Sequence, residues 1–148
     1  MRLLSLGLLA LLAAATLAPS RDGSSSGPAA SSPSVWSIGY ARTHPGAQAG
    51  YLTFLELNWA EARRRAIEEG VVRSFRILAR PDTAEAPWDV MMITEYADSA
   101  AYADREAYFT AMFARPDWET RLVDGKSARA FADLVGDETV LRSVAALP

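Results

Sequence analysis

The sequence contains no cysteine. This excludes the disulfide scaffold that stabilises many small secreted domains, and it also excludes a lipid anchor on a cysteine behind a signal sequence. The fold must therefore be stabilised by burial of apolar surface. Such burial is sufficient for a domain of roughly 110–130 residues, because a domain of that size buries well over half of the surface of its unfolded chain.

Histidine is almost absent as well, since His44 provides the only imidazole. Zinc sites usually draw on several His or Cys ligands, so we predict no metal site. The sequence also lacks a glycine-rich phosphate loop and the Gly-x-Ser-x-Gly motif of serine hydrolases. We therefore predict no cofactor and find no defined catalytic motif, and these observations leave open whether the protein is an enzyme.

An excess of positive charge is missing too. The chain has 15 basic and 18 acidic residues, so its formal net charge is −3. Nucleic-acid binding depends on a basic excess that releases counterions, and no nucleic-acid partner is predicted. The basic cluster Arg63–Arg65 has Glu61 and Glu68 at helical spacing, so we interpret it as a solvated helix face with i,i+4 ion pairs.

The N-terminus is apolar and carries Arg2 as its single charge before Pro19. A leucine-rich centre is followed by small residues at Ala13–Ala18, which is typical of a secretory signal peptide. We predict a signal peptide at residues 1–18, cleavage near Ala18, and a secreted or periplasmic protein. The alternative is a membrane-spanning helix, but the uncharged stretch is at the lower edge of the roughly 17–25 residues required. We therefore expect no membrane association after cleavage.

The next segment, residues 19–34, is dominated by Ser, Gly, Pro and Ala and has no large apolar side chain. Such a segment cannot bury enough surface to offset its chain entropy, so we predict a flexible linker. The folded domain is expected to span residues 35–148.

The folded part shows an alternation of strand-like and helical patterns. Six elements are predicted, at Val35–Tyr40, Ala47–Glu69, Val71–Arg80, Trp88–Tyr96, Ser99–Ala114 and Val140–Val144. Asp98 is the expected N-cap of the second helix. Further helical turns are expected after Pro116 and at Ala128–Val135. The β-α-β-β-α-β order predicts an α+β, ferredoxin-like sandwich.

The two central strands are expected to form a hairpin whose loop is centred near Ala84. In that register Phe75 faces Ile93, and the side of the sheet that carries this pair packs on the helices. The opposite side carries Leu78, Val90 and Met92. Helices cover only one side of such a sheet, and exposed apolar patches mark interfaces, so we predict a homodimer that forms through this second face.

The layout resembles the dimeric α/β-barrel superfamily, which includes the antibiotic-biosynthesis-type monooxygenases. The resemblance lies in the first strand, in Pro45-Gly46 before the Tyr51–Trp59 helix, in Glu69–Val72 entering the next strand, and in Trp88–Tyr96 before Asp98. It implies a homodimer whose sheets face each other and a small-molecule cavity between sheet and helices. The Asn, Trp and His that haem-degrading members use do not match this chain in order or placement.

The candidate ligand-binding residues are Tyr40, His44 and Tyr51, which follow one another around the end of the first strand. His44 is also the candidate catalytic residue, because its unperturbed pKa lies near neutrality. The competing interpretation makes His44 a polar loop residue before Pro45 and makes the aromatic residues core.

Two functions therefore remain. The first is an exported small-molecule-binding or assembly protein with an apolar or aromatic ligand. The alternative is a cofactor-free, monooxygenase-like enzyme that acts on a small aromatic or apolar substrate.

The signal peptide makes a direct prediction. The exported protein should begin near Pro19, and its intact mass should lack the first 18 residues. A Leu8→Arg variant, which interrupts the apolar centre, should keep the full-length mass. A secreted product that retains Met1 would contradict the prediction.

Overall fold

The computed structural model describes residues 33–81, 83 and 85–144. The predicted signal peptide, almost all of the predicted linker and the expected hairpin centre at Ala84 lie outside these residues. Among the described residues, no helix combines the length and apolarity needed to cross a membrane.

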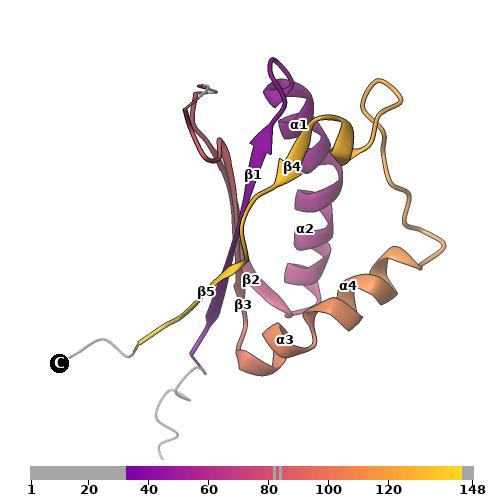
Figure 1. Cartoon of the computed structure of the whole chain (residues 1–148). Helices are drawn as coiled ribbons and strands as arrows, with labels where there is room; N and C mark the ends of the chain where they lie inside the picture. Colours follow the sequence, from indigo (N-terminus) through magenta and orange to yellow (C-terminus); the bar gives the residue numbers. More distant parts are fainter. Residues whose placement is uncertain (1–32, 82, 84, 145–148) are drawn as a thin grey trace, which may run out of the picture. The chain divides into compact units, whose positions relative to one another are not determined.

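The described part of the chain forms one antiparallel sheet with helices on one of its faces (Figure 1). The strand order is β2-β3-β1, and β4 and β5 both pair with the far edge of β1. The strands are β1 (Val35–Thr43), β2 (Val72–Ala79), β3 (Val90–Tyr96), β4 (Ala132–Leu134) and β5 (Thr139–Arg142). The predicted α+β, ferredoxin-like fold is confirmed.

The first predicted helix is present and contains a π-helical segment. It consists of α1 (Gln48–Phe54), η1 (Leu55–Ala60) and α2 (Glu61–Glu68), with helical backbone angles at each junction. The second comprises α3 (Ser99–Ala103) and α4 (Arg105–Phe113). Asp98 caps α3 as predicted, because its carboxylate accepts a hydrogen bond of 2.9 Å from the Ala101 N–H.

The helical turns expected after Pro116 and at Ala128–Val135 are wrong. After Pro116 the chain is irregular, and only Ala128–Ala130 (η2) forms a short 3₁₀ turn before β4. The reason is that the edge of β1 offers unpaired backbone groups. The chain satisfies them through β4, through a 3.0 Å bond from the Val135 N–H to the Tyr40 carbonyl, and then through β5.

The predicted hairpin register is correct at Val72, which pairs with Tyr96, and wrong beyond it. A β-bulge between Val72 and Ser74 adds one residue to β2, so that Phe75 lies opposite Thr94 and Leu78 lies opposite Met91. A shift of one residue exchanges the faces of a strand.

The bulge therefore changes which β3 residues face the helices. Val90 and Met92, predicted on the uncovered face, belong to the core on the helix side. The uncovered face receives Met91 and Ile93 instead, beside Leu78.

Strand β1 separates small from large side chains. The residues that face the helices are small: Val35, Ser37, Gly39, Ala41 and Thr43. Those that face outward are large: Trp36, Ile38, Tyr40 and Arg42. Two consequences follow. The helix side of the sheet keeps free volume beneath the helices, and the outer side carries a large apolar surface.

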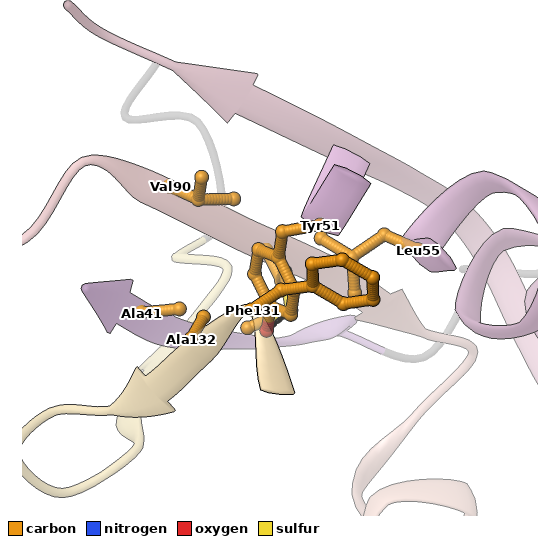
Figure 2. Packing of buried hydrophobic residues seen from close by; sticks show 7 residues of the cluster. Ala41, Tyr51, Leu55, Val90, Phe131 and Ala132 are labelled. Carbon is orange, nitrogen blue, oxygen red and sulfur yellow. Dashed lines mark hydrogen bonds between the residues drawn. The ribbon is translucent and has the colours of Figure 1, made fainter. Parts of the chain in front are cut away.

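The core on the helix side is divided into two clusters. One joins α1 and η1 to the end of the sheet where β1 ends and β3 begins, through buried residues that include Tyr51, Leu55, Val90 and Phe131 (Figure 2). Gly50 permits this packing, since a Cβ there would lie 2.6 Å from the Phe131 ring. The other joins α2 and α4 to the opposite end of the same sheet, where β2 begins and β3 ends, through Ala62, Ala66, Val72, Tyr96, Phe109 and Met112.

Candidate functional site

A cavity of about 690 Å³ lies on the helix side of the sheet. Its wall comes from α1 and η1 on one side, and from β3, η2 and β4 on the other. The lining is mainly apolar and aromatic: Tyr51, Phe54, Leu55, Trp59, Met92, Ala128, Ala132 and Leu134, with Arg129 and Asp133 as the polar members. This size and composition are typical of a small-molecule site, for which volumes of about 300–1,000 Å³ are usual.

A smaller and more polar cavity of about 190 Å³ adjoins the first, and the two share Trp59, Met92 and Leu134 as a common wall. The remaining lining comes from four sheet residues, from Arg63 on α2 and from the turn between β4 and β5. These residues are Ser37, Gly39, Tyr40, Thr94, Arg63, Gly136, Asp137 and Glu138. The smaller cavity thus lies at the edge of β1 where β4 has ended and β5 has not begun.

The π-helical segment positions the shared wall. Asn58 on this segment is buried and fixes the chain that follows α4. Its Nδ2 donates to the Arg121 carbonyl at 2.9 Å, and its Oδ1 accepts from the Arg121 N–H at 2.7 Å. The next residue, Trp59, faces the sheet and meets the Phe75 ring edge-on, with 5.6 Å between ring centroids. The π-helical segment therefore carries both Asn58, which holds the chain at Arg121, and Trp59, which forms the cavity wall. Such π segments are frequent at functional sites.

Tyr51 is the predicted site residue that lines the large cavity. It is 4% exposed, and among the described residues its hydroxyl donates to the Met92 sulfur alone, at 3.9 Å. Burial, with a smaller contribution from the charge of Asp89, raises the pKa of Tyr51 to about 12. The phenol is therefore protonated at neutral pH, and its weak sulfur partner leaves it able to donate to a ligand.

Tyr40 and His44 are not gathered around Tyr51. Tyr40 contributes to the smaller cavity, but its position opposite Met91 sends its side chain to the outer face, where the ring lies 5.3 Å from that of Trp88. His44 lies beyond the end of β1. Its Nε2 lies 3.2 Å from a carboxylate oxygen of Asp133, which lines the large cavity, and its Nδ1 lies 3.3 Å from the Ala130 carbonyl oxygen. A ligand-binding role for these three residues and a catalytic role for His44 stay predictions.

Arg63 is the site residue that sequence reasoning missed. Arg65 forms the expected i,i+4 ion pair with Glu61, whereas Arg64 pairs with Glu56 and Glu61 instead of the expected Glu68. Arg63 instead faces the sheet, with its guanidinium carbon 4.2 Å from the centre of the Trp59 ring. A helical pattern contained the necessary signal, because Arg63 follows Trp59 by four residues and therefore shares its face.

Comparison with known proteins establishes the fold. No protein-family model matches the chain, and no curated protein matches it in sequence. A solved dimeric ferredoxin-like protein from an uncultured marine organism is similar with a TM-score of 0.51 at 15% identity, over 78% of this chain and 99% of that one. The ferredoxin-like fold that the predicted resemblance implies is therefore confirmed.

Two further solved structures have lower scores. HapK from Hahella chejuensis is 20% identical, with a TM-score of 0.48, over 77% of this chain and 96% of that one. SnoaB, a cofactor-independent oxygenase from Streptomyces nogalater, is 15% identical, with a TM-score of 0.46, over 79% of this chain and 99% of that one.

The raised pKa of Tyr51 predicts a pH dependence of stability. The neutral phenol stabilises the fold fully below pH 10, and this contribution is lost as the pH rises through about 12. Tyr51→Phe should cost under about 1 kcal/mol at pH 7, where only a long contact to sulfur is lost. Between pH 7 and pH 11 the free energy of unfolding of the Tyr51→Phe variant should fall by roughly 1 kcal/mol less than that of the unchanged protein.

Urea unfolding of both proteins at the two pH values measures this difference. Tyr108, whose pKa is also raised to about 12, is present in both proteins and cancels in the comparison. Equal alkaline losses in the two proteins would contradict the burial of the Tyr51 phenol.

Proposed function

We propose that this protein binds a small apolar or aromatic molecule in the large cavity between sheet and helices. The observation that carries the proposal is the cavity itself, about 690 Å³ in volume and lined by aromatic and aliphatic side chains. Apolar surface of this kind gains stability when a ligand displaces water from it. The Tyr51 hydroxyl supplies a directional contact that orients the ligand.

A neutral fluorescent probe tests this proposal. N-phenyl-1-naphthylamine should bind with increased fluorescence, and Ala128→Trp should abolish binding because the indole occupies the cavity. Ala128 is half-buried and lines the cavity, whereas Ala130 in the same short helix is exposed, so Ala130→Trp is the matched control. Absence of probe binding to the unchanged protein, or equal binding to both variants, would disprove a ligand site in this cavity.

The second candidate is cofactor-free oxidation, and the pairing of His44 with Asp133 favours keeping it. A histidine beside a carboxylate at the cavity wall is a suitable general base. It would take a proton from an acidic CH₂ group of the bound substrate, and dioxygen would convert that group to a carbonyl with release of water. Dioxygen consumption in the presence of such a substrate, lost in His44→Ala, would support it. If no bound substrate leads to dioxygen consumption, the oxidation candidate fails and only the binding function remains.

We also propose that two copies associate through the outer face of the sheet. This face carries Trp36, Ile38, Tyr40, Leu78, Met91, Ile93 and Leu141. Leu78 is 49% exposed and Leu141 is 51% exposed in the single chain. A contiguous apolar face of this kind is the usual mark of an interface, and the ferredoxin-like protein of similar fold is dimeric.

Substitutions on the two faces of β3 distinguish this assembly from simple destabilisation. Ile93→Lys places a charge at the proposed seam and should convert a dimer to a folded monomer. Ile67→Lys, on an exposed position of α2, should leave the dimer intact. Val90→Lys should instead unfold the protomer, because Val90 has no exposed surface. Sedimentation at micromolar concentration measures the outcome, and a monomeric unchanged protein would disprove the dimer.

Export is the remaining part of the proposal. It is supported by the leucine-rich N-terminus and the small residues before Pro19, and its test is the mass of the exported product.

A further inference from the structure

We infer that the ligand is an amphipathic organic acid whose acidic group binds the Arg63 guanidinium where the two cavities meet. This inference rests on the proposed binding function and narrows its ligand class. An apolar body would occupy the large cavity, and a carboxylate or a chemically similar anion would point toward the small one.

The first observation is the unusual environment of Arg63. Its guanidinium carbon lies 4.2 Å from the centre of the Trp59 ring and 4.4 Å from that of the Phe109 ring. The cation therefore lies over two aromatic rings, in cation–π contact with both. These contacts hold the guanidinium beside the small cavity before any ligand arrives.

The second observation is an unsatisfied donor. The Nε atom of Arg63 is buried and has no hydrogen-bond partner among the described residues. A buried donor without a partner is costly, and its presence requires an explanation. Nε and an adjacent Nη form the edge that a carboxylate binds with two parallel hydrogen bonds.

The third observation is the incomplete compensation of the charge. Among the residues described here, Arg63 has no carboxylate within ion-pair distance, whereas its neighbour Arg64 is paired with Glu56. Burial lowers the pKa of Arg63 to about 10, while the Tyr96 hydroxyl and the charge of Glu138 act in the opposite direction. The group therefore still carries its charge at neutral pH.

The acidic residues at the small cavity bear on the kind of acid that binds. Glu138 lines it but is already bonded to the Tyr102 hydroxyl at 2.9 Å and to Arg105 at 3.3 Å. Asp137 is exposed on the same turn. These carboxylates repel any anion at Arg63, and a small inorganic anion gains nothing in the large cavity that offsets the repulsion. An acid with an apolar body gains the burial of that body against the aromatic and aliphatic lining of the large cavity.

A matched pair of competitors tests the inference. N-phenyl-1-naphthylamine serves as the neutral reporter, and 2-naphthoate and 2-naphthamide, which differ at the acidic group, compete with it. We expect naphthoate to displace the reporter at about one-tenth of the naphthamide concentration, because a charge-assisted pair replaces an unsatisfied donor. Arg63→Met should abolish this preference while the neutral reporter still binds. Arg64→Met, which removes an equal charge from the exposed face, should keep it.

The outcomes separate the inference from the function on which it rests. If the reporter binds and naphthoate competes no better than naphthamide, the acid inference fails and the binding function stands. If the preference survives Arg63→Met, another group holds the acid and the assignment to Arg63 is wrong. If Arg63→Met fails to bind the reporter, Arg63→Lys decides, because it keeps the charge without the planar edge and should reduce the preference. If the reporter never binds the unchanged protein, the proposed function itself fails.

Discussion

The alternation of small and large side chains along β1 is the constraint on which the rest of the structure depends. Ser37, Gly39 and Ala41 have small side chains, which leave free volume between the sheet and the helices. The side chains of the helices do not fill this volume completely. Trp36 and Ile38 on the reverse side create apolar surface that no helix of the described chain covers. One strand thus accounts for both the cavity and the outer face, because consecutive side chains of a strand point in opposite directions.

The helices limit this free volume from the other side. Their contacts with the sheet concentrate in two buried clusters, and Trp59 and Arg63 lie on the face between them. Trp59 packs against the first cluster, its ring contacts Phe75 and the Arg63 guanidinium, and it lines both cavities. The guanidinium of Arg63 occupies a place where an aliphatic side chain would complete the core. A charged group there costs stability, since burying charge is unfavourable, and the proposed recognition of an acid explains why the charge is kept.

Much of the fold could be predicted from the sequence, because periodicity and punctuation are local signals. The β-α-β-β-α-β order and the Asp98 cap follow from such signals. The faces of the hairpin could not be predicted in this way, since the bulge at Arg73 adds a residue to β2 without a turn or glycine signal in the sequence. Strand β4 was missed because its three residues are extended only by pairing with β1. Arg63 was missed because charge was given more weight than its position on the apolar helix face.

The site and the proposed assembly cannot be treated as independent. Tyr40 shows why: its neighbour Gly39 faces the helix side, both residues line the small cavity, and the Tyr40 ring packs on Trp88 toward the outer face. A second copy seated on the outer face would fix the position of this segment, and a ligand in the cavity would fix it from the opposite side. If the second copy favours a position of β1 that changes the affinity for the ligand, the ligand changes the affinity between the two copies by the same factor, because the coupling between two binding events is reciprocal. The thickness of a single strand therefore separates the two proposed surfaces and also connects them.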